Sequence, residues 1–156
     1  IVKRGNAYSV PEPVIVTLAE PAIFTTLGTG VGQGMVYAVE EDGRRVLADV
    51  ERPLKPGDRM AILCIGLGPV DRPLPDGIPS PEEAPPQAIN KIVVMIQNRE
   101  AGQVRAHLAS GLIGVYWVTA TVPAGITADA TADVSVNVGE LVSAAVTAAT
   151  SPVAAG

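Results

Sequence analysis

The acidic side chains between positions 71 and 83 are the first candidates for chemistry in this chain. Asp71, Asp76, Glu82 and Glu83 could supply oxygen ligands to calcium or act as an acid pair. Calcium loops, however, present closely spaced ligands in a defined order, and prolines interrupt this stretch. Asp76 directly precedes Gly77, a typical turn pair. We therefore interpret these acids as turn residues and predict no metal site.

The other reactive side chains do not combine into a catalytic arrangement. The glycines at positions 28, 30, 32 and 34 lack the Lys-Ser/Thr ending and the helix of a phosphate-binding loop. His107 is the single histidine, which excludes a multi-histidine zinc site, and we expect it at the surface. Cys64, the single cysteine, lies in an apolar run, which indicates a buried, unreactive thiol. Because no serine has the flanking glycines of a nucleophile elbow, we predict no enzymatic activity, no catalytic residue and no cofactor.

Trp117, Thr119 and Thr121 are the best candidates for a binding site. They alternate with the apolar residues Tyr116 and Val118, which predicts an outward stripe on one strand. An exposed tryptophan could stack on a sugar ring or contact a neighbouring domain. The alternative is that another segment of the same chain covers this face, because tryptophan is commonly buried.

A stripe of this kind requires β-strands, and the sequence predicts about nine short ones. No stretch combines helical periodicity, helix caps and adequate length. Short apolar runs separated by turn residues instead predict an all-β chain, folded as an antiparallel sandwich of about seven to nine strands. The predicted strands are residues 14–19, 35–39, 45–50, 59–65, 91–97, 104–109, 116–122, 134–138 and 142–148.

The connections between these strands are also predicted. Asp42-Gly43 predicts a hairpin, because glycine supplies the positive φ that the turn needs. Residues 98–102 are expected to form a loose hairpin turn between 91–97 and 104–109. The run 59–65 is apolar on both faces, which predicts a central strand covered on both sides. Residues 66–77, rich in glycine and proline, are expected to leave that strand and cross the sandwich without ladder hydrogen bonds.

Composition limits the classes of partner. The 156 residues match one domain of common size. A net charge of −5, with lysines and arginines scattered singly, predicts no nucleic-acid partner. No apolar stretch approaches the ~20 residues of a membrane span, and the opening Ile1-Val2-Lys3-Arg4 has no apolar leader. A first residue other than Met leads us to expect an excerpt of a longer protein.

An ordered set of short motifs resembles the Solibacter-type C-terminal domain family over roughly residues 21 to 150. The motifs are Pro21-Ala22-Ile23-Phe24, Gly30-Val31-Gly32-Gln33-Gly34, Asp42-Gly43, Lys55-Pro56-Gly57-Asp58, Gly66-Leu67-Gly68-Pro69-Val70, Pro75-Asp76-Gly77, Gly111-Leu112-Ile113-Gly114-Val115-Tyr116 and Val118-Thr119-Ala120-Thr121-Val122-Pro123-Ala124-Gly125. Cys64 and Trp117 depart from the family's usual residues.

This resemblance implies an Ig-like sandwich at the carboxy end of a large exported bacterial protein, located outside the cell or in its envelope. It implies a non-catalytic structural or interaction module whose partners are neighbouring domains of the same polypeptide. The alternative is a module that binds a glycan, another ligand or another protein through the face around Trp117.

An internal echo and the extent of the resemblance together predict a division of the chain. Residues 1–20 are predicted to be the closing strand of, or a linker from, a preceding Ig-like unit, because 16–21 echoes 146–152. The resemblance implies that residues 21–150 form the Ig-like C-terminal domain, and residues 151–156 are expected to form a tail.

Overall fold

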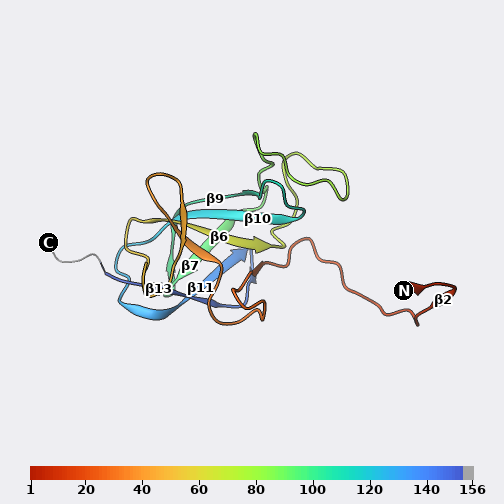
Figure 1. The fold of residues 1–156 in the computed structure, drawn as a ribbon, viewed down its shortest axis with the longest axis horizontal. Coiled ribbons are helices and arrows are strands. Elements are labelled where there is room, and N and C mark those ends of the chain that lie inside the picture. Colours follow the sequence, from red (N-terminus) through yellow and green to blue (C-terminus); the bar gives the residue numbers. More distant parts are fainter. Residues whose placement is uncertain (153–156) are drawn as a thin grey trace.

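The computed structural model describes residues 1–152, which are all-β and contain no helix (Figure 1). The predicted all-β sandwich is confirmed. Five of its thirteen strands contain only two residues, so the eight longer ones agree with the predicted number. The strands are β1 (Lys3–Arg4), β2 (Ala7–Tyr8), β3 (Ala22–Ile23), β4 (Val36–Val39), β5 (Arg45–Leu47), β6 (Arg59–Ile65), β7 (Ile92–Ile96), β8 (Arg99–Glu100), β9 (Gly102–Leu108), β10 (Val115–Thr121), β11 (Asp129–Val138), β12 (Leu141–Val142) and β13 (Val146–Thr150).

The first layer is a six-stranded antiparallel sheet in the order β5-β4-β6-β10-β9, with β3 also paired to β6. Its centre is β6, which pairs along its whole length with β10 and on its other side with β4 and β3. Apolar residues at alternate positions of β6 and β10 face the other sheet and are buried, which places both strands in the core. These side chains are Met60, Ile62, Cys64, Tyr116, Val118 and Ala120.

The second layer is a five-stranded sheet in the order β12-β11-β7-β8, with β13 also paired to β11. Val134, Val136 and Val138 of β11 are buried and alternate with more exposed residues, as their spacing predicts. They join the core cluster that the first sheet lines from the opposite side. Mostly Val, Ile and Ala side chains therefore fill the space between two layers, the arrangement of a β-sandwich.

The hairpin predicted at Asp42-Gly43 is confirmed. Gly43 has φ of +84° and connects β4 to β5, whose residues pair as Tyr37 with Leu47 and Val39 with Arg45. A residue with a side chain is disfavoured at such a φ, so the glycine fixes this turn.

The hairpin predicted across residues 98–102 is wrong. Gln97 and Asn98 both have positive φ and fold β7 back onto the two-residue strand β8 within the second sheet. Beyond the buried Ala101 the chain changes layers, and β9 pairs with β10 in the first sheet. Apolar alternation is the same in both sheets, so the sequence pattern could not reveal this change of layer.

β6 was predicted to be covered on both sides, and this is wrong for the face that points away from the second sheet. Ala61 is buried there, but Leu63 is half-buried and Ile65 is 39% exposed. Within residues 1–152 this face is shielded by neighbouring side chains of the same sheet and by no further layer.

The predicted strand at residues 14–19 is also wrong. Residues 9–18 form an extended segment, hereafter the arm, that leads from the small β1–β2 hairpin to the sandwich (Figure 1). No other strand pairs with the arm among residues 1–152. The predicted strand 142–148 is interrupted, because β12 ends at Val142 and β13 begins at Val146. Of the predicted tail, Ser151 and Pro152 lie outside the strands, and residues 153–156 lie outside the described residues.

The end of the arm is fixed at the stretch that follows β6. The amide of Glu20 donates a hydrogen bond to the carbonyl oxygen of Gly66 at 2.8 Å, and Ala19 is buried. Gly66 has φ of +75°, and a Cβ there would overlap the Glu20 carbonyl oxygen. Leu67 is fully buried, and the Tyr116 hydroxyl donates to the Gly68 carbonyl oxygen at 2.6 Å. The glycine-rich stretch therefore anchors the incoming arm as well as ending the central strand.

Candidate functional site

The candidate site is the side of the six-stranded sheet that faces away from the core, here called the outer face. Strand alternation places its residues on β4, β5, β6, β9 and β10, and on β4, β6 and β10 they alternate with buried neighbours. It comprises Tyr37, Val39, Arg45, Leu47, Arg59, Ala61, Leu63, Ile65, Arg105, His107, Val115, Trp117, Thr119 and Thr121. The predicted alternation of Trp117, Thr119 and Thr121 with buried residues is confirmed, and each of the three is half-buried.

Trp117 lies in an aromatic cluster. The Tyr37 ring meets it edge-on, with centroids 5.8 Å apart and planes at 71°, a favourable geometry for aromatic pairs. The guanidinium carbon of Arg45 lies 4.3 Å from the centroid of the indole, within the range of a cation–π interaction. One face of the indole is therefore occupied by Arg45, so a sugar ring would have to displace this guanidinium to stack there.

His107 borders this cluster, because it is the residue opposite Trp117 on β9. Its half-burial lowers the pKa of the imidazole below the ordinary value, and the positive charge of Arg45 lowers the pKa further. His107 was expected at the surface, and it is half-buried beside Trp117. Both effects favour the neutral imidazole.

Thr119 and Thr121 lie towards the other end of β10 and line a separate hollow of about 410 Å³. Arg59 on β6 pairs with Thr121, and Arg105 on β9 pairs with Thr119, so an arginine flanks each threonine. The three predicted residues thus share one face but divide between an aromatic cluster and a polar hollow.

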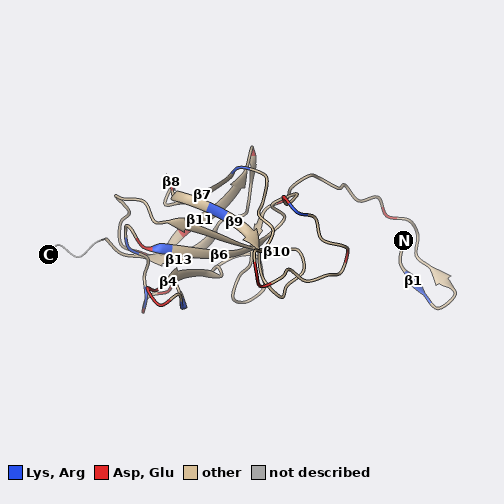
Figure 2. Cartoon of the chain, turned by 90° about the horizontal axis from the view of Figure 1, so that it is seen from above, with Lys and Arg blue, Asp and Glu red and all other residues tan. Residues whose placement is uncertain are grey.

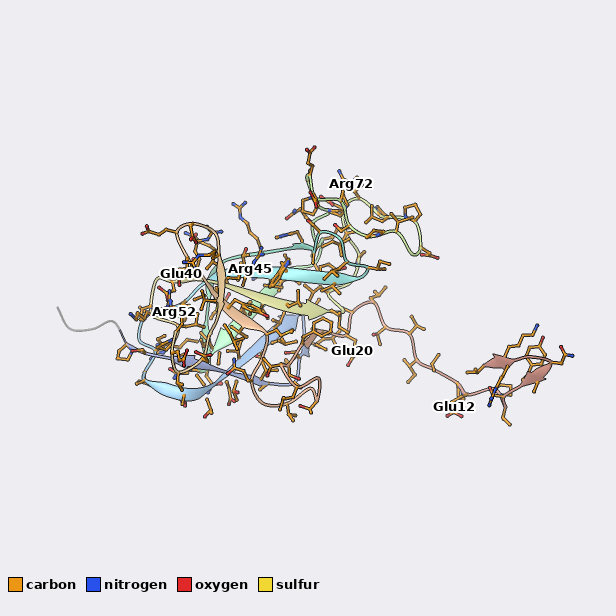
Figure 3. The ribbon with its side chains drawn as sticks, viewed as in Figure 1. Glu12, Glu20, Glu40, Arg45, Arg52 and Arg72 are labelled. Atoms are coloured by element: carbon orange, nitrogen blue, oxygen red, sulfur yellow. The ribbon has the colours of Figure 1, made fainter. Side chains whose placement is uncertain are left out.

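The outer face carries positive charge and no carboxylate. Among residues 1–152 the ion pairs join Arg44 to Asp42, and Arg52 to both Glu40 and Asp58. Arg45, Arg59 and Arg105 take part in none of them. Figure 3 labels Arg52 and Glu40. Figure 2 shows basic residues within the strands of the sandwich as well as in its turns. This concentration of unpaired arginines contrasts with the net charge of −5 of the whole chain.

The other residues considered for chemistry lie apart from one another. Asp71 accepts a hydrogen bond from the Gln87 amide at 2.9 Å, and Asp76 is exposed in the following turn. No group of three or more His, Cys, Asp or Glu side chains among the described residues could hold a metal. Cys64 is buried in β6, and this burial raises the pKa of its thiol to about 12. No helix in the described part of the chain is long and apolar enough to cross a membrane.

Sequence reasoning missed Tyr37 and Arg45. Tyr37 does alternate with the buried Val36 and Ala38, which marks it as outward. Its proximity to Trp117 depends on the register of β4 and β10 on opposite sides of β6, which no local pattern specifies.

The sheet edge at β9 is partly closed to a further strand. Residues 86–88 cover its second half, with hydrogen bonds from Leu108 to Pro86 and from Ala88 to Ala106. In its first half the register with β10 shifts, and Gln103 has φ of +50°. A bulge of this kind disrupts the regular edge that strand addition requires.

A second hollow, of about 520 Å³, lies where the arm meets the sandwich. It is lined by Thr17, Leu18 and Ala19 of the arm, by Asn90 and Lys91, and by Val138, Gly139 and Leu141. Leu18 and the neighbouring Leu141 and Val142 are exposed apolar side chains.

No protein-family model, curated protein or solved structure matches this chain.

Proposed function

We propose that this chain is a non-catalytic module of an exported or cell-surface bacterial protein, and that it packs against a neighbouring module of the same polypeptide. The resemblance to the Solibacter-type C-terminal domains supports the exported setting and the Ig-like class of sandwich. The arm supports the contact with a neighbour, and it is the observation that carries the proposal.

The arm exposes apolar side chains that are suited to a strand. Val14 is 79% exposed, Ile15 is 94% exposed, and both Val16 and Leu18 are 89% exposed. β-Branched residues of this kind favour strands because they pack on a pleated surface, and a contiguous exposed apolar segment marks an interaction site. The β1–β2 hairpin that precedes it is exposed throughout, and an isolated two-stranded hairpin has marginal stability in water. Both elements therefore gain stability by joining a sheet outside residues 19–152.

The root of the arm defines where the neighbour would lie. Glu20 and Gly66 hold the end of the arm against the sandwich, and the hollow beside Leu18 and Leu141 has a mainly apolar lining. A neighbour that took residues 14–18 as a strand would approach this hollow and bury both leucines. The contact would then be continuous from the arm to the sandwich.

Hydrogen exchange tests this proposal. In a longer polypeptide that includes the preceding segment, the amides of residues 14–18 should exchange at least about tenfold more slowly than in the 156-residue chain. The exposed loop at 28–32 serves as the control, because its exchange should be equal in both proteins. Equal exchange of residues 14–18 in both would refute the contact with a preceding module.

A second candidate function is favoured by the outer face. Its unpaired arginines beside the Tyr37–Trp117 pair support the binding of a glycan or another ligand. A glycan-array comparison of the wild-type chain with Trp117→Ala tests this function. Signals that are lost in the variant support it, and an absence of signals for the wild type contradicts it.

A further inference from the structure

The polar hollow on the outer face is lined by hydrogen-bond donors and lacks a carboxylate. Its lining comprises Arg59, Gln103, Val104, Arg105, Thr119, Ala120 and Thr121. The guanidinium groups, the Gln103 amide and the threonine hydroxyls all can donate to an oxyanion. Neither arginine is engaged in an ion pair within residues 1–152.

The two arginines flank the hollow from opposite sides. Arg59 on β6 and Arg105 on β9 are separated by the single strand β10 and are level with Thr121 and Thr119 respectively, so their Cα atoms lie about 12 Å apart. Side chains of arginine length can converge over that distance on a group placed above Thr119 and Thr121. Asp58, which adjoins Arg59 in sequence, is held by Arg52 at 2.9 Å. The carboxylate closest to Arg59 in sequence is therefore paired with Arg52 and not with Arg59.

We propose that this hollow binds the oxyanion of an acidic carbohydrate, a carboxylate or a sulfate, in the fork of Arg59 and Arg105. Guanidinium groups bind such planar or tetrahedral anions through paired charge-assisted hydrogen bonds. The threonine hydroxyls and the Gln103 amide suit the hydroxyl groups of the same sugar. This inference rests on the second candidate function and specifies the class of its ligand.

A carbohydrate fits the outer face better than an isolated anion, because the face continues along β10 from the hollow to the Trp117 cluster. Trp117 lies about 7 Å from Thr119 along the strand, with Arg45 stacked on its ring. An extended acidic chain could place one anionic group in the hollow and a second against Arg45. A free phosphate ion would occupy the hollow alone.

Calorimetric titration of the 156-residue chain tests this inference with three hexasaccharides: a galacturonate oligomer, a heparin oligomer and neutral maltohexaose. We expect both acidic oligomers to bind, with weaker binding at higher salt, and maltohexaose to bind at least about tenfold more weakly. Arg59→Gln and Arg105→Gln should each reduce acidic-oligomer affinity by about tenfold. Arg4→Gln removes the same charge from the exposed β1–β2 hairpin and should leave affinity unchanged.

The outcomes separate this inference from the function on which it rests. Equal affinity for maltohexaose, unaffected by the two arginine variants but lost in Trp117→Ala, overturns the oxyanion site and preserves glycan binding. Binding of polyglutamate but of no hexasaccharide overturns the carbohydrate ligand. Binding of none of these probes overturns both.

Discussion

The guanidinium carbon of Arg45 lies 4.3 Å from the centroid of the Trp117 ring, although two strands, β4 and β6, separate β5 from β10. The long arginine side chain spans them, and Tyr37 on β4 meets the edge of the indole. Leu63 on β6, which is paired with Trp117 on the same outer face, is only half-buried. The Arg45–Trp117 contact therefore shields part of a sheet face that no second layer covers in the described part of the chain.

We predict that Arg45 and Trp117 are energetically coupled. A double-mutant cycle with Arg45→Gln and Trp117→Leu, measured by urea unfolding, should give a coupling energy of about 0.5 to 1 kcal/mol, as for cation–π pairs near the surface. Arg44→Gln is the matched control, because Arg44 contacts Asp42 instead. A coupling energy within error of that for Arg44 and Trp117 would contradict the prediction.

We predict that Gly66→Ala destabilises the fold more than Gly77→Ala. Both glycines have nearly the same φ, +75° and +78°, so the backbone strain of about 1–2 kcal/mol is common to the two variants. Only at Gly66 would the new Cβ meet the Glu20 carbonyl oxygen, while Gly77 has no neighbouring atom within 4 Å. Urea unfolding should show an excess loss for Gly66→Ala of at least about 1 kcal/mol. Faster exchange of the Glu20 amide should accompany it, and equal losses would show that the anchor contributes nothing.

We predict that His107 makes stability depend on pH. Because burial and Arg45 lower its pKa in the folded state, the unfolded state binds a proton more readily. The contribution of neutral His107 is fully present above the unfolded pKa of about 6.5 and is lost as the pH falls through the lower folded pKa. Between pH 7 and pH 5 the Tm of the wild type should therefore decrease more than that of His107→Gln. The same decrease in both proteins would exclude this contribution.

We predict that the Cys64 thiol does not react in the native protein. Its pKa of about 12 leaves very little thiolate at pH 8, and the side chain is fully buried. Iodoacetamide should leave the folded chain unmodified over hours and alkylate it within minutes in 8 M urea. Rapid alkylation under native conditions would show that β6 opens locally.

The features that depend only on local sequence pattern were predicted correctly. The alternation of β10 and β11 and the Asp42-Gly43 hairpin were readable, because side-chain direction and turn chemistry are local properties. The burial of Cys64 followed from its apolar run.

The features that depend on which strands pair with each other could not be predicted from the sequence. The arm has the composition of a strand, yet a strand needs a partner that residues 19–152 do not supply. The change of layer after Ala101 and the meeting of Tyr37, Arg45 and Trp117 depend on strand order and register. Apolar periodicity is the same for every order, so only the structure could show them.

The bulge at Gln103 and the cover over Leu108 limit how copies of this sandwich can associate. A regular open edge on β9 would allow sheets to join side by side without limit, as in fibrils. With that edge irregular in one half and covered in the other, lateral growth is disfavoured there. If the arm joins a neighbouring module as proposed, the contact between units would run through the arm and would leave the β9 edge out.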